Sequence, residues 1–268
     1  MARKISQTFT RFTHGESDSG ITVRMHSRER FKLRRNNSVM ISVIVPALNE
    51  AERITGLISS LQNLGGEKEI IISDGGSTDG TREKLSAQRN ITLINSPSGR
   101  ARQMNAGAEI SSGNILWFVH ADSVVSPSSL HDIERAISDG AIGGFFRLKF
   151  YDADDKFMKF IERTSHTRAK NFCLIFGDQG LFLRRDIFDG LGGFADVSLM
   201  EDWEISRRLR TFHRLGLIHA LDTVIGTSAR RYTQNGRLKT WLKMNIVKAL
   251  YILGVDTERL RRIYDGRK

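Results

Sequence analysis

Three apolar runs in the first half of the chain each end at a polar turn that carries a carboxylate. The runs cover 42–45, 70–72 and 115–119, and the acids that follow them are Glu50, Asp74 and Asp122. Consecutive strands of a parallel α/β sheet end at the same edge, so such acids gather in one crevice, where these sheets bind ligands. Because gathered carboxylates repel one another, we expect them to share a cation, a proton or a hydrogen-bond donor of a ligand.

The elements around these runs alternate between helix and strand. Apolar residues at 54, 57, 58 and 61 predict a helix with one buried face. Further elements are predicted as a helix over 78–85, a strand over 91–94, a helix over 100–110 and a helix from Ser126-Pro127 to Gly140. This alternation predicts the α/β class, with a mostly parallel central sheet flanked by helices.

The second half of the chain is less regular and is expected to build the acceptor side of the crevice. The pattern predicts a strand over 146–150, a helix over 154–164, a short strand over 180–183 and a charged helix over 201–212.

The positive charge of the chain is concentrated at its two ends. Net charge is +11, yet residues 41–227 hold 21 Lys and Arg against 24 Asp and Glu, whereas residues 228–268 hold 11 against 3. A nucleic-acid-binding domain carries its positive charge on the folded body, so we expect no nucleic-acid partner. We therefore predict one main domain over 40–231, a basic N-terminal segment over 1–39 and a basic, amphipathic helical extension over 232–268.

The N-terminal segment lacks apolar periodicity and is predicted to be disordered. Met25 and Met40 are alternative translation starts, so the segment is either a functional basic arm or an artefact of start-site choice. The single cysteine, Cys173, is expected to be buried and inert. No run reaches the length of a membrane span and no signal peptide is recognisable, so a cytoplasmic protein is expected.

The segment 73–81 places Asp74 at the end of a buried strand, before glycines that leave room for a flat ring or a phosphate. An ionised carboxylate only accepts hydrogen bonds, so Asp74 suits the imide N–H of uracil or the N1–H and amino group of guanine. The alternative is that Asp74 only forms the turn. Asp79 is expected to cap the following helix.

The tripeptide His120-Ala121-Asp122 ends the fourth predicted strand. A carboxylate and an imidazole at this spacing can hold one divalent ion while diphosphate oxygens and waters complete its shell, as Mg²⁺ prefers. Imidazole suits Mn²⁺ better than Mg²⁺, and the alternative is that His120 orients its neighbours by hydrogen bonding. The expected cofactor is Mg²⁺ or Mn²⁺ at Asp122.

The charged helix opens with Glu201, Asp202 and Glu204. Acids in a first helical turn are favoured by the helix dipole, which explains Glu201 and Glu204 without any function. Asp202 is the candidate for chemistry. Arg207 and two further arginines on this helix either bind anionic phosphates or form a solvated face.

Six segments, taken in order, resemble the inverting glycosyltransferases of family 2 and their GT-A nucleotide-diphospho-sugar fold. They are SVIVPALNE at 42–50, SDGGSTDGT at 73–81, GRARQMNAGA at 99–108, WFVHADS at 117–123, FGDQGLFLRR at 176–185 and MEDWEISRRLR at 200–210. The resemblance covers about residues 41–231. The order and spacing of the six segments are similar to those of a bacterial subgroup of family 2-like transferases.

The resemblance implies roles for matching positions. Asp122 matches the last acid of the family's metal-binding Asp-x-Asp, with His120 in place of the first acid. Asp202 matches the catalytic base, and Glu201 lies beside the acceptor. Residues 224–228 lack the metal-binding His that many relatives place there. Together with the residue patterns, the resemblance predicts a nucleotide-sugar site made of Pro46, Ala47, Glu50, Asp74, Gly76, Arg102, Asn105, His120, Ala121 and Arg207.

The reaction that the resemblance implies is transfer of a sugar from a nucleoside diphosphate, either UDP or GDP and with UDP favoured, to an acceptor hydroxyl. Asp202 would take the hydroxyl proton, the oxygen would attack the anomeric carbon with inversion, and a divalent ion would neutralise the leaving diphosphate. Arg230 and Arg231 either steady the diphosphate or form a basic surface turn.

Two other functions are open from the sequence. A sugar nucleotidyltransferase of the same fold would need a glycine-rich, cationic loop after the first strand, which residues 46–50 do not supply. A non-enzymatic, basic nucleic-acid-binding protein would leave Asp74, Asp122 and Asp202 unexplained.

The C-terminal segment carries a mostly apolar helical stripe with lysines beside it. The stripe consists of Leu238, Trp241, Leu242, Asn245, Ile246, Ala249 and Leu253. It either packs onto the core of the enzyme or attaches the protein peripherally to an anionic leaflet at the inner face of the membrane. Because many family members act on lipid-linked acceptors, a lipid-linked acceptor is one expectation.

Overall fold

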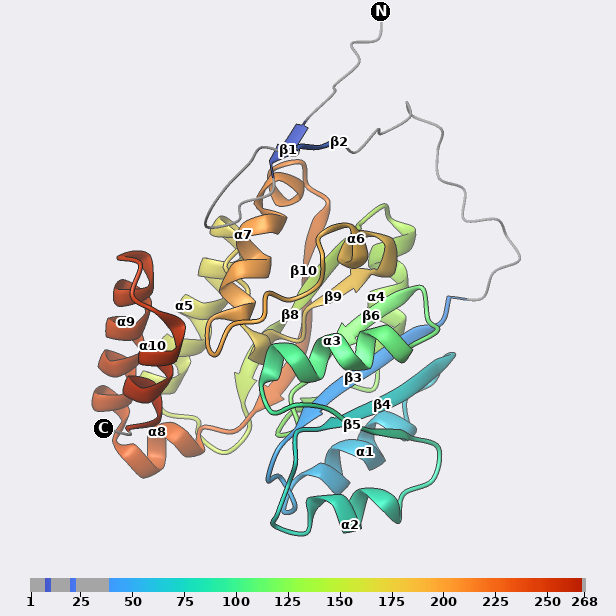
Figure 1. The fold of residues 1–268 in the computed structure, drawn as a ribbon, viewed down its shortest axis with the longest axis horizontal. Coiled ribbons are helices and arrows are strands. Elements are labelled where there is room, and N and C mark those ends of the chain that lie inside the picture. Colours follow the sequence, from blue (N-terminus) through green and yellow to red (C-terminus); the bar gives the residue numbers. More distant parts are fainter. Residues whose placement is uncertain (1–7, 11–19, 23–38, 267–268) are drawn as a thin grey trace, which may run out of the picture. The chain divides into compact units, whose positions relative to one another are not determined.

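A mixed eight-stranded sheet forms the centre of the protein in a computed structural model that describes residues 8–10, 20–22 and 39–266 (Figure 1). Its strands are β3 (Ile41–Ala47), β4 (Lys68–Asp74), β5 (Thr92–Asn95), β6 (Ile115–Phe118), β7 (Val124–Val125), β8 (Gly143–Phe150), β9 (Phe182–Arg184) and β10 (Ile218–Thr227). Their order across the sheet is β5-β4-β3-β6-β9-β8-β10-β7.

Most strand pairs in this sheet are parallel. The neighbours β5, β4, β3 and β6 run parallel, as do β8 and β10, whereas β9 runs antiparallel between β6 and β8 and β7 runs antiparallel at one edge. The predicted α/β class with a mostly parallel central sheet is confirmed. Because β4, β3 and β6 are adjacent and parallel, their carboxyl ends share one edge, as the spacing of the three acidic turns predicts.

Helices cover both faces of the sheet. The helices before the C-terminal part are α1 (Ile54–Gln62), α2 (Thr81–Ser86), α3 (Arg100–Ile110), α4 (Ser129–Ser138), α5 (Lys156–Phe172), α6 (Arg185–Gly190) and α7 (Glu201–Arg214). Buried residues of α1, α2 and α4 pack on the face of β3 that carries Val43 and Val45. Residues of α3, α6 and α7 and the end of α5 pack on the opposite face, around Ile44 and Phe118.

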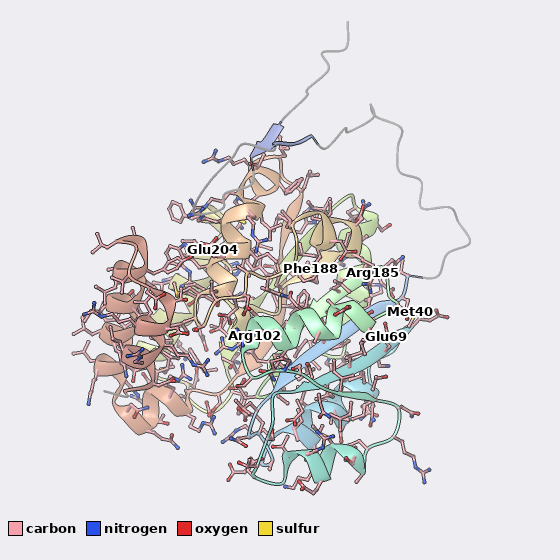
Figure 2. All side chains as sticks on the ribbon, in the orientation of Figure 1. Met40, Glu69, Arg102, Arg185, Phe188 and Glu204 are labelled. Atoms are coloured by element: carbon pink, nitrogen blue, oxygen red, sulfur yellow. The ribbon has the colours of Figure 1, made fainter. Side chains whose placement is uncertain are left out.

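The amino end of the sheet is held by a cluster of hydrogen bonds around Glu69. Its carboxylate accepts hydrogen bonds from the hydroxyl of Ser42 and from the backbone N–H groups of Ser112 and Gly113. Nearby, the guanidinium of Arg185 donates to the carbonyls of Ala108 and Gly113; Figure 2 labels Glu69 and Arg185 at this end of the sheet. These contacts fix β3, β4 and α3 from behind and leave the carboxyl edge free for a site.

The C-terminal part consists of α8 (Arg230–Asn235), α9 (Arg237–Ile252) and α10 (Thr257–Asp265). Tyr232 of α8 packs with Met158 and Ile161 of α5, and Val247 and Leu260 pack with Trp203 of α7. The part of the chain from Val39 onward forms one compact unit, so this extension is joined to the main fold rather than separate from it (Figure 1).

Several predicted element boundaries differ from the structure. The helix expected to start at Ser126-Pro127 begins at Ser129, and the helix expected over 154–164 extends to Phe172. The strand β10 was not predicted, because its register shifts between Ala220 and Val224 and half-exposed residues interrupt its alternation. Cys173 is fully buried, as expected, and burial raises the pKa of its thiol to about 12.

The N-terminal segment departs in part from the predicted disorder. Two short strands, β1 (Thr8–Thr10) and β2 (Gly20–Thr22), pair antiparallel. Threonine, phenylalanine and isoleucine favour strands, a preference that the overall polar composition conceals. The other residues of 1–38 and residues 267–268 lie outside the described part of the chain, and so does most of the predicted disordered segment.

Candidate active site

A cleft of about 790 Å³ opens at the carboxyl edge of the sheet. Its walls come from the turn after β3, the end of β6, the start of α3, the start of α7 and helices α5, α8 and α9. Of the residues predicted from sequence, those that line it are Pro46, Glu50, His120, Ala121, Asp122, Glu201 and Asp202. Residues separated by more than 150 positions thus meet in one cavity.

Two of the three strand-end acids are electrostatic neighbours, as the sequence pattern predicts. Burial raises the pKa of Glu50, and the nearby carboxylate of Asp122 raises it further, while Arg230 and Arg53 act in the opposite direction. The guanidinium of Arg230 lies 4.0 Å from the Glu50 carboxylate. The protein itself, through Arg230, therefore supplies part of the positive charge that these acids need.

The third acid, Asp74, is turned into the protein. Its side chain is 1% exposed, and it accepts hydrogen bonds from the backbone N–H and hydroxyl of Ser77, with Arg82 3.7 Å away. Neither Asp74 nor Gly76 is among the residues that line the cleft. Asp79 accepts a hydrogen bond from the N–H of Thr81, the first residue of α2, which is the structural role expected of it.

The turn after β3 and the segment 74–81 are held together by side chains. Asn49, at φ 56°, accepts a hydrogen bond from the N–H of Thr78, and its own N–H donates to the hydroxyl of Ser77. Asparagine tolerates this left-handed conformation better than other non-glycine residues. Asp74 therefore supports the turn after β3 through Ser77 and Asn49.

Gln103 is a positioning residue that the sequence did not single out. Its side-chain amide donates to the carbonyls of Ala47 and Ser73, each at 2.8 Å, and so joins the ends of β3 and β4 to α3. A Cβ at Gly75 would lie 3.0 Å from this amide, so a glycine is needed there. Arg100 and Gln103 are three positions apart, so they share one face of α3. This spacing is the signal that would have placed both on the inner face of the helix.

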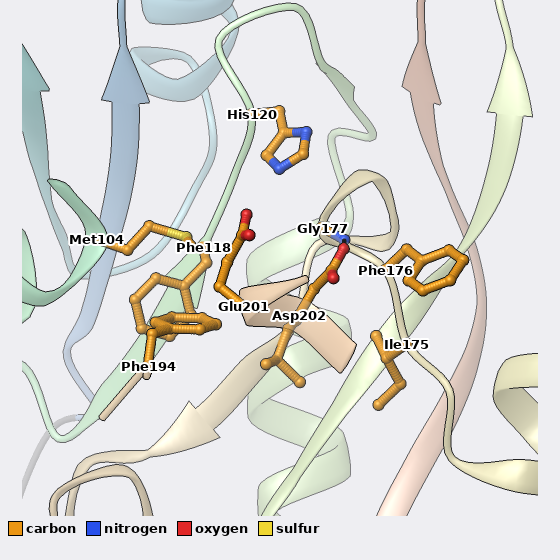
Figure 3. Close-up of a pocket in the computed structure, with 10 residues that line it drawn as sticks. Met104, Phe118, His120, Ile175, Phe176, Gly177, Phe194, Glu201 and Asp202 are labelled. Atoms are coloured by element: carbon orange, nitrogen blue, oxygen red, sulfur yellow. Dashed lines mark hydrogen bonds between the residues drawn. The ribbon is translucent and has the colours of Figure 1, made fainter. Parts of the chain in front are cut away.

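Glu201 and Asp202 begin α7 and face the cleft together (Figure 3). The Glu201 side chain is 4% exposed and pairs with the guanidinium of Arg100 at 3.2 Å. Asp202 accepts hydrogen bonds from the backbone N–H of Gly177 at 3.1 Å and of Trp203 at 2.7 Å. The residue before them, Met200, has a φ of 76°, a strained conformation for a residue other than glycine and one that tends to occur at functional sites.

The pKa of Asp202 is raised to about 7. Burial is the largest cause and the neighbouring Glu201 the second, while Arg100 and the N–H of Gly177 lower it. Apolar side chains next to the acids, among them Met104, Phe118 and Phe194, line a small cavity of about 10 Å³ together with them (Figure 3). A carboxyl group with a pKa near neutrality suits a general base.

His120 is buried and uncharged. Burial lowers the pKa of its imidazole to about 3, and the positive charges of Arg100 and Arg231 contribute. Among the described residues its Nε2 has no hydrogen-bond partner, and it faces Gly177, where a Cβ would lie 2.3 Å away. The position after Phe176 is thus restricted to glycine.

A metal ion at this edge of the sheet would need most of its coordinating oxygens from a bound molecule rather than from protein side chains. The part of the chain from 39 to 266 contains no group of three His, Cys, Asp or Glu residues placed to hold one. At this edge of the cleft, the strand-end turns offer the carboxylates of Asp122 and Glu50 together with the neutral imidazole of His120. This donor set fits a hard divalent ion that takes most of its oxygens from a diphosphate and water, and does not fit a closed protein site.

Six cationic side chains line the cleft, and most were not predicted as site residues. They are Arg100, Arg168, Arg230, Arg231, Lys248 and Arg261. Arg230 and Arg231 were left open between a diphosphate contact and a surface turn. Arg168 lies beyond the predicted end of its helix, and Lys248 was seen only as the basic flank of an apolar stripe.

Besides Asp74, Gly76 and the fully buried Ala47, three further residues predicted for the nucleotide site do not line the cleft. Arg102 pairs with Asp196 at 2.7 Å, and Asn105 exchanges hydrogen bonds with the backbone N–H and carbonyl of Phe194. These two lie on the side of α3 that holds the loop before α7. Arg207 is exposed and lies 4.0 Å from Glu204 of its own helix. In place of these three, Arg100 contributes the guanidinium of α3 to the cleft.

The family model described as Glycosyl transferase family 2 matches residues 42–192, more than half of the chain. The chain belongs to glycosyl transferase family 2. The match ends before α7, so the placement of Glu201 and Asp202 in the cleft is independent of it.

Relatives of this transferase occur in mycobacteria. A PGL/p-HBAD biosynthesis glycosyltransferase of Mycobacterium bovis is 25% identical over 244 residues, 84% of each chain. An uncharacterized protein of Mycobacterium tuberculosis is 29% identical over 138 residues, and that match spans 49% of this chain and 43% of the relative.

Solved glycosyltransferase structures share the fold. S. aureus TarS in complex with UDP-GlcNAc superposes with a TM-score of 0.57 at 19% identity, over 71% of this chain and 59% of that one. Glucosyl-3-phosphoglycerate synthase of Mycobacterium tuberculosis, in complex with Mn²⁺ and UDP, superposes with a TM-score of 0.56 at 17% identity, over 74% and 75%. The transferase therefore has the GT-A fold predicted from its sequence.

The substitution Asp202→Asn is expected to stabilise the protein, and more so at about pH 8 than at about pH 5. The carboxyl has a pKa raised from 3.8 to about 7 in the fold, so the folded state keeps a proton that the unfolded state has already lost. Stability conferred by this group is complete at low pH and is lost as the pH rises through that window, whereas asparagine does not ionise. Thermal melts across this range measure the difference.

The exposed Asp139, at the end of α4, provides the control. Asp139→Asn should melt like the wild type at each pH. An Asp202→Asn variant whose advantage does not grow with pH would contradict the raised pKa.

Proposed function

We propose that the protein transfers a sugar from a nucleoside diphosphate to an acceptor hydroxyl with inversion, using Asp202 as the base. The observation that carries this proposal is the meeting of Asp202, with a pKa of about 7, and the strand-end acid Asp122 in one cleft. The acceptor oxygen forms a bond to the anomeric carbon as the bond to the diphosphate breaks on the opposite side. The hydroxyl proton passes to Asp202, and the diphosphate leaves with the electron pair.

The donor occupies the side of the cleft beneath the turn after β3. Pro46 and Glu50 line the cleft there and would face the nucleoside, Ala47 is buried between them, and Asp74 supports the turn from behind through Ser77. UDP is the favoured nucleotide, because two solved structures with this fold hold UDP or a UDP-sugar. His120 and Ala121 form the floor between the nucleoside and the acids of α7.

Fixed positive charges receive the diphosphate. Arg100, Arg230 and Arg231 line the cleft, and Asp122 is an electrostatic neighbour of Arg100 and Arg231. Mg²⁺ or Mn²⁺ would be held by Asp122 together with the diphosphate, and when bound it would neutralise the leaving group. The relative with glucosyl-3-phosphoglycerate in its site holds Mn²⁺ beside UDP, which supports a divalent ion here.

UDP with Mn²⁺ is expected to stabilise the wild type by about 2.7 kcal/mol at a hundredfold excess over Kd, or roughly 5 °C in melting temperature. Asp122→Asn should lose most of this shift, because the diphosphate and its ion then lack their carboxylate. Asp202→Asn should keep the shift and lose transfer. Thermal melts with a panel of nucleotides and nucleotide sugars, with and without EDTA, test this.

The exposed variant Asp139→Asn serves as the control and should respond to UDP as the wild type does. The proposal of glycosyl transfer is falsified if no nucleotide or nucleotide sugar in the panel stabilises the protein.

A second proposal concerns α9, which has two different faces. Thr240 and Val247 are buried on the inner face, whereas an apolar stripe on the opposite face is exposed to water. The stripe consists of Leu238, Leu242, Ile246, Ala249 and Leu253. In the part of the chain from 39 to 266, no helix has the length and hydropathy needed to cross a membrane. The stripe therefore suits contact with a leaflet surface rather than a span.

We infer that this stripe attaches the protein to an anionic leaflet and brings the cleft to a membrane-borne acceptor. Lys239 and Lys243 flank the stripe, and each basic residue near an anionic surface contributes about 1 kcal/mol. On its other flank, Trp241 and Asn245 line the cleft. A lipid-linked acceptor could thus enter beside α9 without leaving the leaflet.

The protein is expected to co-sediment with vesicles that contain phosphatidylglycerol, and much less with vesicles of phosphatidylcholine alone. Leu242→Asp should lower the bound fraction severalfold, because it places a charge in the middle of the stripe. Leu215→Asp, at an exposed leucine after α7, is the matched control and should bind as the wild type does. Equal recovery with both vesicle types, or none with either, would rule the attachment out.

A further inference from the structure

The acceptor side of the cleft carries two positive charges that the proposed reaction does not use. Lys248 of α9 and Arg168 of α5 both line the cleft and both lie at the ring of Phe176. The guanidinium carbon of Arg168 is 3.9 Å from the ring centroid, and the ammonium of Lys248 is 4.9 Å from it. The aromatic ring holds the two cations in place in the wall of the cleft.

Arg168 is fixed by the protein and keeps its charge directed at the cleft. Its Nε donates to the carbonyl of Leu174 at 3.1 Å, and a second nitrogen lies 3.5 Å from the side-chain oxygen of Gln179, which is fully buried. Both acceptors are neutral. The acidic neighbours of the guanidinium are Asp178 and Asp202, and burial raises the pKa of each, which favours their uncharged forms. Holding a charged side chain in this manner serves to preorganise it for an anion.

Lys248 is the free member of the pair. Within residues 39–266, its ammonium contacts the ring of Phe176 but has no carboxylate within 4.0 Å and donates no hydrogen bond. Burial lowers its pKa to about 8, and Arg168 lowers it further, while Asp178 and Asp202 offset only part of this. A partly buried lysine without a partner is costly to keep unless a ligand completes it.

These two cations belong to the acceptor and not to the donor. The electrostatic neighbours of Lys248 are Arg168, Asp178 and Asp202, and do not include Asp122 or Glu50. The donor end of the cleft has its own cations in Arg100, Arg230 and Arg231. Lys248 therefore lies near the proposed base and is not a neighbour of the strand-end acids that would face the nucleotide, which places it where an acceptor would bind.

We propose that Lys248 and Arg168 form a subsite for a phosphate group carried by the acceptor. This inference rests on the proposed function, because that function places the nucleotide at the other end of the cleft. Two cations match the charge of a phosphate monoester near neutral pH, and a guanidinium beside an ammonium suits its oxygens. The adjoining wall of Ile161, Trp241 and Met244 is apolar and would cover the neighbouring part of the acceptor.

The test measures binding of inorganic phosphate to protein already saturated with UDP and Mg²⁺, at constant ionic strength. UDP blocks the donor end, so the remaining phosphate site is the acceptor one. Wild-type protein should bind phosphate saturably, and Lys248→Met should weaken that binding about tenfold or more, which corresponds to about 1.4 kcal/mol. Lys248→Arg should restore it. Lys170→Met, which removes an exposed charge from α5, should leave it unchanged.

The source of the phosphate is distinguished by a second probe. Geranyl phosphate in detergent should bind about tenfold more tightly than inorganic phosphate if the acceptor is a lipid phosphate, since its chain would bury apolar area against the wall of the cleft. Equal binding of the two would indicate a soluble phosphate ester. Either result supports the subsite.

The subsite is overturned if UDP-saturated wild type does not bind phosphate, or if Lys248→Met binds it as the wild type does. Circular dichroism and the UDP shift establish that the variant is folded, and Arg168→Gln replaces it if it is not. If UDP itself causes no shift, the donor site has failed instead, so the two failures are separable.

Discussion

The ion pair between Arg100 and Glu201 is the contact on which the site depends. It joins the start of α3 to the start of α7, two elements that lie 101 positions apart in the chain. The Glu201 side chain is 4% exposed, whereas that of Arg100 is 38% exposed. Removal of Arg100 would leave the buried carboxylate of Glu201 without its counter-charge, which is destabilising. The same guanidinium is an electrostatic neighbour of Asp202, Asp122 and Asp178. Its positive charge allows Glu201 and these three acids to lie close together while the pKa of Asp202 remains about 7.

Much of the fold and half of the site could be predicted from the sequence, because both follow from local patterns. Strand runs that end in acidic turns require a common edge, and that edge brought Glu50 and Asp122 together. Asp202 was reached through its motif at the start of a charged helix. The strand-end acids are informative because carboxylates that gather at one edge of a sheet repel one another unless a cation, a proton or a ligand is shared among them.

The missed residues depend on contacts between distant segments. Arg100 and Arg102 are both arginines at the start of α3, so the sequence does not distinguish them. Only the rotation of α3 against the sheet decides that Arg100 faces the cleft, whereas Arg102 pairs with Asp196. Arg168 became a site residue because α5 is longer than its pattern indicates. Lys248 is in the cleft because α9 packs against α7 and α5, a choice that its two-sided apolar character leaves open. Helix periodicity fixes which residues share a face, but not which face meets which neighbour.

We expect the carboxyl edge of the sheet to hold the nucleotide and to present its leaving group to the acids of α7. A structure of the protein with UDP bound would show this. The uracil should lie at the turn after β3, the diphosphate between Asp122 and the arginines Arg100, Arg230 and Arg231, and the Asp202 carboxylate should face the open space where the sugar would lie. A nucleotide bound elsewhere, or one whose diphosphate points away from Asp122 and α7, would contradict it.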